Sequence, residues 1–406
     1  MNKDMIAAEI NCRNTSTTTT NMAVENCNTI NNNQPNKTAC LSGSDEIAFE
    51  EHPEAEAYLK HLLEDGCNEG DSGYDMELPS WYDEHLFKQG QNFMNKYRFV
   101  IQSGMLSGLV AVLAIPSILR VLMCTRQSNT SATAYRRYVR TLLHTISWYK
   151  YSPEDKSSKF WISLKAVRKA HSKSSRACAK LGAGQITQKD LALTQFGFIG
   201  FLSLGAHRIQ LDDEHFLEAT AHMWRVLGYL LGIKDEYNIC GRDWKETKLR
   251  LDIVMRKVYE PALENPSEDF QQMAKALLDG LWHINTTLTV GSFIYLTKRL
   301  CYVKGYEYFE FDYPARRKPD PQQRLAYKDL SWLDRFIVFY ALIIVTYLHK
   351  FDIVRCYLNF RAWINEQLIE YLPYIAILKF GTAWAYVSIF NRNGGEQEFQ
   401  YHLKEE

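Results

Sequence analysis

The chain has 406 residues, of which 46% are hydrophobic and 23% are charged, and its 47 basic and 47 acidic residues give a formal net charge of zero. A chain of this length and apolar content can bury one large core or two modest ones. Because the balanced charge creates no basic field, nucleic acid is excluded as an expected partner.

The beginning of the chain has little that could form a core. Residues 1–44 are rich in Asn, Thr and Ser, which predicts a disordered tail. They contain no apolar stretch typical of a signal peptide, so we expect an intracellular protein, in the cytoplasm or on the cytoplasmic face of the endoplasmic reticulum. Nine scattered cysteines without a Cys-x2-Cys pair indicate free thiols in a reducing compartment and no structural zinc site. Residues 45–80 form an acidic linker, with a helix-compatible pattern between Ala48 and Leu63.

A compact helical region is predicted from 81 to 390. Apolar residues at helical spacing lead into a long apolar run from Met105 to Cys124, which Pro116 should kink or divide. Residues 104–119 carry no charge, but these sixteen residues are fewer than the roughly twenty needed to cross a bilayer. A buried helix is therefore favoured over a membrane span.

The middle of the chain predicts more helices and no strands. No segment alternates polar and apolar residues with period two, so the predicted fold class is all-α, one large helical domain. Thr187 with Asp190 three residues later predicts the start of a helix, and Gly232 predicts the end of another. The predicted helical segments are 134–150, 157–181, 188–204, 213–231, 244–258 and 270–300.

The C-terminal part combines an irregular segment with two apolar runs. Residues 304–329 are rich in proline and aromatic residues, which predicts a loop that packs over the core or, alternatively, lines a ligand entrance. The runs 336–348 and 368–390 are too short, or too often interrupted by charge and proline, to span a membrane. They favour peripheral contact with a membrane. Residues 391–406 form a polar tail.

One histidine carries the main functional hypothesis. His171 follows Arg168 by one helical turn, and we expect the two to share a face with Val167 and Leu164. A lone helical histidine is more often structural than a ligand. A neutral imidazole beside apolar surface can nevertheless ligate haem iron, and nearby guanidinium groups can pair with haem propionates.

These residues resemble the rubber oxygenase (latex clearing protein) family and the ER-bound oxygenase mpaB catalytic domain, an all-helical haem b fold. The resemblance rests on Arg137-x3-Thr141 followed by His171, and it extends from about residue 81 to 389. It implies that His171 is the proximal iron ligand and that Arg137 and Thr141 lie on the distal side of a haem pocket between helices. Further matching segments are 167–171, 192–196 and 224–232.

Two departures from the family concern its chemistry. The rubber-cleaving members have a lysine before the threonine that can ligate iron reversibly, whereas this chain has Arg140, which stays protonated and cannot coordinate. Those members also resemble one another in having a carboxylate on the helix that precedes the arginine, and this carboxylate is taken as a catalytic base. Residues 106–123 of this chain contain no acid, so general-base catalysis by that route is in doubt.

Three hypotheses follow. The first is a haem b oxygenase that uses O2 to cleave or oxidise a carbon–carbon double bond of an apolar isoprenoid or lipid-like substrate. In this hypothesis His171 holds the iron, and Arg137 and Thr141 shape the distal pocket. Arg140 adds positive charge to that pocket. Arg168 pairs with a haem propionate or fixes the helix that carries His171. The second is a catalytically silent helical carrier that binds haem or lipid. The third is an integral membrane protein with several short helices.

Overall fold

The computed structural model describes residues 52–209, 211, 213–306 and 325–391. The chain divides into two units, Met1–Asp45 and Glu46–Glu406. The predicted tail at 1–44, the predicted tail at 391–406 except for its first residue, the first residues of the acidic linker and most of the predicted loop at 304–329 lie outside the described residues.

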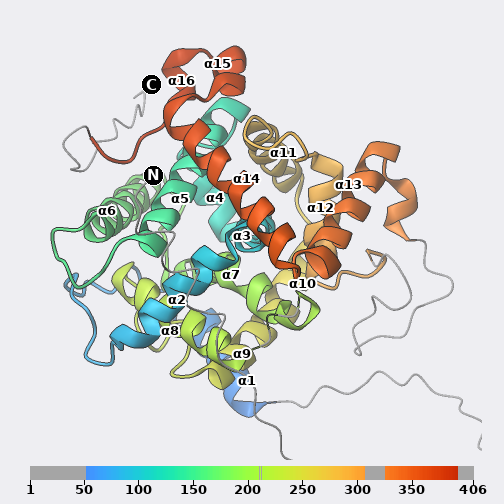
Figure 1. The fold of residues 1–406 in the computed structure, drawn as a ribbon. Helices are drawn as coiled ribbons and strands as arrows, with labels where there is room; N and C mark the ends of the chain where they lie inside the picture. The colour runs from blue at the N-terminus through green and yellow to red at the C-terminus, as the bar shows by residue number, and fades with distance from the viewer. Residues whose placement is uncertain (1–51, 210, 212, 307–324, 392–406) are drawn as a thin grey trace, which may run out of the picture. The chain divides into compact units, whose positions relative to one another are not determined.

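The described residues are helical and contain no strand, which confirms the all-α fold class (Figure 1). The longer helices up to residue 230 are α1 (Pro53–Glu64), α2 (Glu84–Lys96), α3 (Arg98–Val112), α4 (Pro116–Cys124), α5 (Ser131–Lys150), α6 (Lys159–Lys180), α7 (Gln188–Leu204) and α8 (Glu214–Leu230). Those that follow are α9 (Trp244–Val254), α10 (Glu260–Glu264), α11 (Glu268–Leu281), α12 (Val290–Leu300), α13 (Trp332–Ile343), α14 (Asp352–Tyr371), α15 (Tyr374–Phe380) and α16 (Thr382–Ala385). Short 3-10 helices are η2 (Ala206–Ile209) and η5 (Ala326–Asp329), and π-helical turns are η3 (Met255–Tyr259) and η6 (Ile344–Leu348).

Pro116 divides the long apolar run, as the sequence predicts. It is the first residue of α4, where its missing N–H costs nothing, and α4 is bent by 89° from α3. In the described part of the chain no single helix is long and apolar enough to cross a membrane. The bent pair α3 and α4 meets the requirement of length and composition only when its two helices are taken together.

The predicted single helical segment at 270–300 is wrong, because two helices occupy it. The side-chain oxygen of Asn285 accepts hydrogen bonds from the backbone N–H and the hydroxyl of Thr287, at 3.2 and 2.8 Å, and forms a turn in the break. Thr289 then starts α12 by accepting a hydrogen bond from the N–H of Ser292. Local side-chain hydrogen bonds therefore interrupt a pattern whose apolar spacing alone favours one helix.

The two predicted helix boundaries are confirmed. Thr187 and Asp190 form a reciprocal capping box at the start of α7, which satisfies two backbone N–H groups. Gly232 follows the end of α8 with a φ of 96°, a left-handed conformation that glycine adopts without steric cost.

Two glycines allow the closest helix crossing of the core. α3 and α7 pack against each other at Gly108 and Gly197, and a Cβ atom on Gly108 would lie 1.6 Å from the carbonyl oxygen of Gly197. Since α7 also packs on α8 and α9, this crossing holds α3 against the centre of the helical domain.

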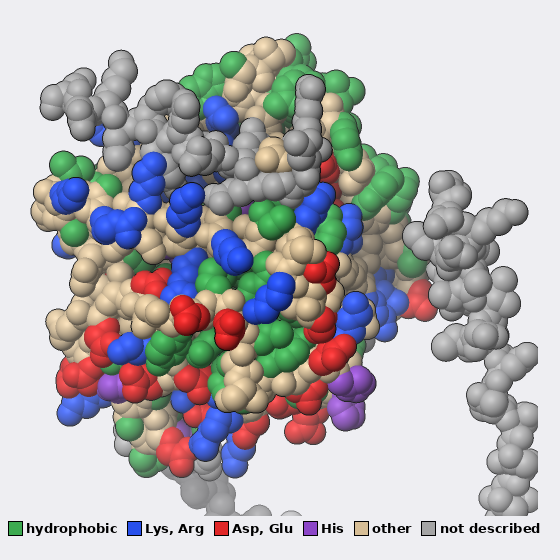
Figure 2. All heavy atoms as spheres, turned by 90° about the vertical axis from the view of Figure 1, so that its left-hand side faces the viewer, with side chains coloured by type: hydrophobic (Ala, Val, Ile, Leu, Met, Phe, Trp, Pro, Cys, Tyr) green, Lys and Arg blue, Asp and Glu red, His purple; other side chains and the backbone are tan. Residues whose placement is uncertain are grey.

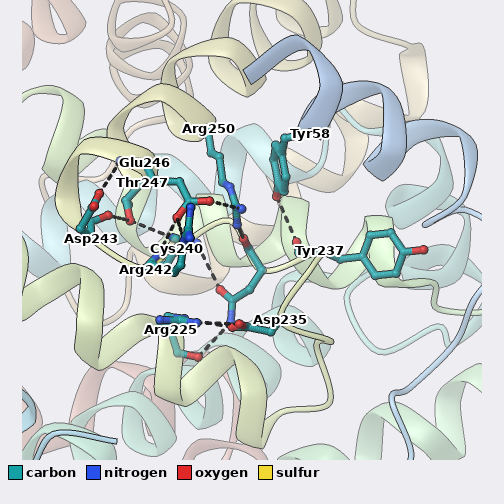
Figure 3. A network of polar contacts seen from close by, with 12 residues as sticks. Tyr58, Arg225, Asp235, Tyr237, Cys240, Arg242, Asp243, Glu246, Thr247 and Arg250 are labelled. Carbon is teal, nitrogen blue, oxygen red and sulfur yellow. Dashed lines mark hydrogen bonds and ion pairs between the residues drawn. The ribbon is translucent and has the colours of Figure 1, made fainter. Parts of the chain in front are cut away.

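A polar network fixes the connection between α8 and α9 (Figure 3). The guanidinium of Arg225 pairs with Asp235 at 2.6 Å and stacks over the ring of Trp81, 3.9 Å from its centroid. Arg250 donates hydrogen bonds to the Asn238 carbonyl and to Glu246, both at 2.5 Å. These contacts satisfy backbone groups of an irregular segment that borders the core.

Candidate functional site

A cavity of about 350 Å³ lies among α5, α6 and α7, and residues of α3, α4 and α8 complete its wall. This volume is within the range of ligand and cofactor pockets, and most of the lining surface is apolar. The apolar part of the wall includes Leu109, Val112, Leu113, Ile118, Val121, Leu122, Leu191, Phe198 and Trp224.

One face of α5 supplies polar groups to this cavity. Arg137, Thr141, His144 and Trp148 recur at positions i, i+4, i+7 and i+11, so consecutive turns of the helix place them on the same side. Arg140, one residue before Thr141, also lines the cavity. The hydroxyl of Thr141 donates to the Arg137 carbonyl at 3.2 Å.

The facing side of α6 supplies His171. Val167, Ala170, His171 and Ser174 follow the same helical spacing and line the cavity. Among the described residues, neither ring nitrogen of His171 has a hydrogen-bond partner, and Nδ1 is buried. Burial, reinforced by the charge of Arg137, lowers the pKa of His171 to about 4. At neutral pH this imidazole is uncharged and has a free lone pair.

A second imidazole, that of His144, faces the same cavity. Its Nδ1 lies 2.8 Å from the hydroxyl oxygen of Ser163, which accepts a hydrogen bond from the indole N–H of Trp148 at 2.9 Å. This hydrogen bond occupies one ring nitrogen of His144 and orients the imidazole between α5 and α6. Burial, and then the charges of Arg140 and His171, lower the pKa of His144 to about 4. The His144 imidazole is therefore uncharged at neutral pH.

The predicted shared face of α6 is only partly correct, because Arg168 and Leu164 are buried away from the cavity wall. The guanidinium of Arg168 donates to both carboxylate oxygens of Asp71, at 2.5 and 2.8 Å, and to the carbonyl of Tyr74 at 2.8 Å. These hydrogen bonds occupy the guanidinium N–H groups that Arg168 would need to pair with a haem propionate. Arg168 instead fixes α6 to the segment before α2, which leaves it a positioning role.

We expect Arg168→Ala to lower the free energy of unfolding by about 2–3 kcal/mol, since it leaves a partly buried carboxylate without its partner. Urea denaturation measures the difference. Arg176→Ala on the same helix is the matched control, because Arg176 is exposed and its loss should change stability by less than about 0.5 kcal/mol.

The same ion pair predicts a pH dependence. Burial alone would raise the pKa of Asp71, but hydrogen bonds from Arg168 and Gly73 outweigh it and lower the pKa. Because the folded pKa lies below the unfolded value, the stabilisation is present at neutral pH and is lost as the pH falls below about 4. Asp71→Asn should remove this part of the acid sensitivity, and an unchanged acid transition would contradict the assignment.

Cations gather around the cavity wall. Besides Arg137 and Arg140, the wall includes Lys169 and Lys173, both of which are exposed. These two lysines have no role in the predicted site, yet they line the cavity beside Ala170, His171 and Ser174 of α6. Four cations beside an apolar slot suit a flat ligand with carboxylates at its edge.

Asp190 is predicted only as part of a helix cap. Within the described residues, it is also the one acidic side chain that lines the cavity. One carboxylate oxygen accepts from the Ser117 hydroxyl at 2.6 Å, and the other accepts from the Thr187 N–H at 3.1 Å. The side chain is buried. Both carboxylate oxygens of Asp190 therefore accept a hydrogen bond, one from Ser117 and one from the helix cap at Thr187. That Asp190 borders the cavity depends on how the helices pack.

A site with several metal ligands is not present in the described part of the chain. No group of three or more His, Cys, Asp or Glu side chains there could hold a metal ion. Haem iron needs only one protein ligand, because the porphyrin supplies four nitrogens.

The comparisons with known proteins give one structural likeness. No protein-family model matches the sequence, and no curated protein matches it. The chain is similar to a solved structure described as "Structure of Latex Clearing Protein LCP in the closed state", with 19% sequence identity and a TM-score of 0.47. The likeness covers 78% of this chain and 86% of that chain.

Proposed function

We propose that this protein is a haem b-dependent oxygenase that acts with O2 on a carbon–carbon double bond of an apolar isoprenoid or lipid-like substrate. One observation carries the proposal: His171 presents a neutral imidazole, which has no hydrogen-bond partner within the described residues, to an apolar cavity bordered by cations. The sequence resemblance in Arg137, Thr141 and His171 supports the same assignment.

The donor set of the cavity fits haem b. His171 would ligate the iron, because its pKa leaves the ring uncharged at neutral pH. Arg137, Arg140, Lys169 and Lys173 carry the positive charge that would pair with the two propionates. The aliphatic wall supplied by α3 and α4 would contact the porphyrin and the substrate.

When bound, haem supplies the activation of O2, and cleavage of the alkene by one O2 gives two carbonyl groups. The residues of the chain would bind and orient the reactants. The apolar wall would exclude water and hold the alkene, while the His144 imidazole faces the same cavity and would offer a hydrogen bond to the reacting oxygen. With Asp190 engaged at both oxygens, His144 is the group best placed to hold or transfer a proton.

We expect His144→Phe to retain haem and to lower turnover by about 100-fold, because phenylalanine keeps the ring volume and removes the N–H. The Soret band measures haem binding, and oxygen consumption measures turnover. Unchanged oxygen consumption with full haem occupancy would show that His144 has no part in the reaction.

The test of the proposed function is haem titration of the purified full chain, followed by oxygen consumption with polyisoprenoid and unsaturated lipid substrates. We expect a Soret band and substrate-dependent oxygen uptake, with carbonyl products detected by mass spectrometry. A protein that shows no Soret band after addition of haem would contradict the proposal.

A carrier of haem or lipid without catalysis is the second candidate. The engaged carboxylate of Asp190 and the presence of Arg140, which cannot ligate iron, favour it. Stable haem binding without oxygen uptake on any tested alkene would support the carrier.

A further inference from the structure

The C-terminal helix α14 has its apolar side turned outward. Ile353, Tyr357 and Phe360 follow one another at positions i, i+4 and i+7, and their exposed fractions are 87%, 61% and 55%. Tyr371 continues the same stripe and is 67% exposed. A surface helix of a soluble domain normally turns such a stripe toward the core.

The opposite side of α14 is fastened by polar groups. Glu366 is buried, where it pairs with Arg98 at 3.2 Å and accepts a hydrogen bond from Gln102 at 2.8 Å. Asn359 donates to the Lys96 carbonyl at 2.7 Å and accepts from the N–H of Phe99 at 3.1 Å. The helix thus contacts the domain through these hydrogen bonds and through its buried side chains Leu358, Ala362 and Ile369. The described residues leave its aromatic side uncovered.

The same spacing recurs in α13. Trp332, Phe336 and Phe339 lie at i, i+4 and i+7 and are 80%, 60% and 43% exposed. Among the described residues, all but four of the large hydrophobic side chains that are exposed lie between Trp332 and Tyr386; the four are Leu63, Tyr74, Leu181 and Trp282. We call the exposed apolar side chains of residues 332–386 the C-terminal apolar face.

The figures show where the C-terminal helices lie and how side chains are distributed on one face of the molecule. In Figure 1, α14 runs across the front of the helical domain toward α15 and α16, with α13 beside its other end. Figure 2 shows hydrophobic side chains at the upper edge of the molecule, where Figure 1 places α15 and α16, whereas charged side chains dominate the lower part of that view. A soluble monomer rarely exposes so many neighbouring apolar side chains.

The charges of the C-terminal apolar face favour an anionic lipid surface as the occupant. Lys350 and Lys379 are exposed and directly flank exposed apolar residues. Three of the four acids between 332 and 386 are engaged: Asp334 with the Ser331 hydroxyl, Asp352 with Arg355, and Glu366 with Arg98. Tryptophan and tyrosine are the residues that prefer the boundary between lipid and water, and lysine pairs there with anionic headgroups.

We infer that the C-terminal apolar face is a membrane-binding surface that lies on a phospholipid bilayer, with the stripe of Ile353, Tyr357 and Phe360 inserted below the headgroups. Helix α14 lies in the plane of the interface, as amphipathic monotopic helices do. The inference depends on α13 and α14 and not on haem, so it stands apart from the proposed function. An apolar alkene dissolved in the bilayer would be a substrate within reach of such a protein.

Vesicle flotation of the full chain tests the membrane-binding surface. The probes are vesicles of phosphatidylcholine alone and of phosphatidylcholine mixed with phosphatidylserine. Wild type should float with both and more completely with the anionic vesicles. Ile353→Glu with Phe360→Glu should lower the partition coefficient at least about tenfold, because each change removes an inserted apolar side chain.

The matched control is Leu63→Glu with Leu181→Glu, which adds the same charge at exposed leucines outside the C-terminal apolar face. We expect the control to float as wild type does, and circular dichroism to show both variants folded. Wild type that stays at the bottom of the gradient with both vesicles overturns the inference, as does equal flotation of the two variants. A dimer without vesicles that the Ile353 and Phe360 variant dissociates would assign the face to a second copy instead.

Discussion

His171→Ala is expected to abolish the Soret band of the haem-loaded protein. The substitution removes the neutral imidazole that would ligate the iron, and loss of a metal ligand weakens binding at least about 100-fold, more than loss of a group that only orients one. His144 should not replace it, because its Nδ1 is hydrogen-bonded to the Ser163 hydroxyl, which fixes the ring in its present orientation. Titration with haem, followed by absorbance, measures the effect.

Two controls separate ligation from folding in this experiment. His144→Phe removes the other imidazole that faces the cavity and should keep the band. Imidazole added to His171→Ala should restore the band, since it can enter the space vacated by the side chain. If His171→Ala binds haem as wild type does, or if His144→Phe alone loses the band, His171 is not the iron ligand.

Gly108→Ala is expected to cause the largest loss of stability among the substitutions considered. The new Cβ atom would lie 1.6 Å from the Gly197 carbonyl oxygen, a backbone atom that cannot rotate away. α3 and α7 must separate, and we expect the free energy of unfolding to fall by at least about 3 kcal/mol, the upper range for overpacked cores. Urea denaturation measures the change.

Gly104→Ala on the same helix is the control for Gly108→Ala. Its Cβ atom would have no neighbour closer than 3.9 Å. Because alanine favours helix more than glycine does, this variant should be neutral or about 1 kcal/mol more stable than wild type. Equal stability of the two variants would show that α3 and α7 do not cross as closely as the structure has them.

Separation of α3 from α7 would also disturb the cavity. Leu109 and Val112 of α3 line it, as do Leu191 and Phe198 of α7. We therefore expect Gly108→Ala to weaken haem binding even where the protein remains folded, while Gly104→Ala leaves haem binding unchanged.

Much of the helical architecture could be predicted because local signals determine it. The period of apolar residues, the capping pair Thr187 and Asp190, Pro116 and Gly232 each act within one or two turns of the chain. The break between α11 and α12 was missed because it depends on hydrogen bonds of Asn285 and Thr289 that apolar spacing does not reveal.

The site could be predicted only where its residues share a helix. The spacing of Arg137 and Thr141 places them on one side of α5, and the structure puts both at the cavity with His171. Spacing could not show that Arg168 pairs with Asp71, which lies 97 residues earlier in the chain. It also could not show that Asp190, an evident helix cap, borders the cavity.

The sequence by itself determined the all-α class and the main helix boundaries, because these depend on short-range periodicity and residue chemistry. Only the tertiary structure decided which side chains meet. Packing of distant helices directs Arg168 to Asp71, brings His144 and Asp190 to the cavity of His171, and turns the aromatic side of α14 outward. Those contacts join residues far apart in the chain, and no local pattern encodes them.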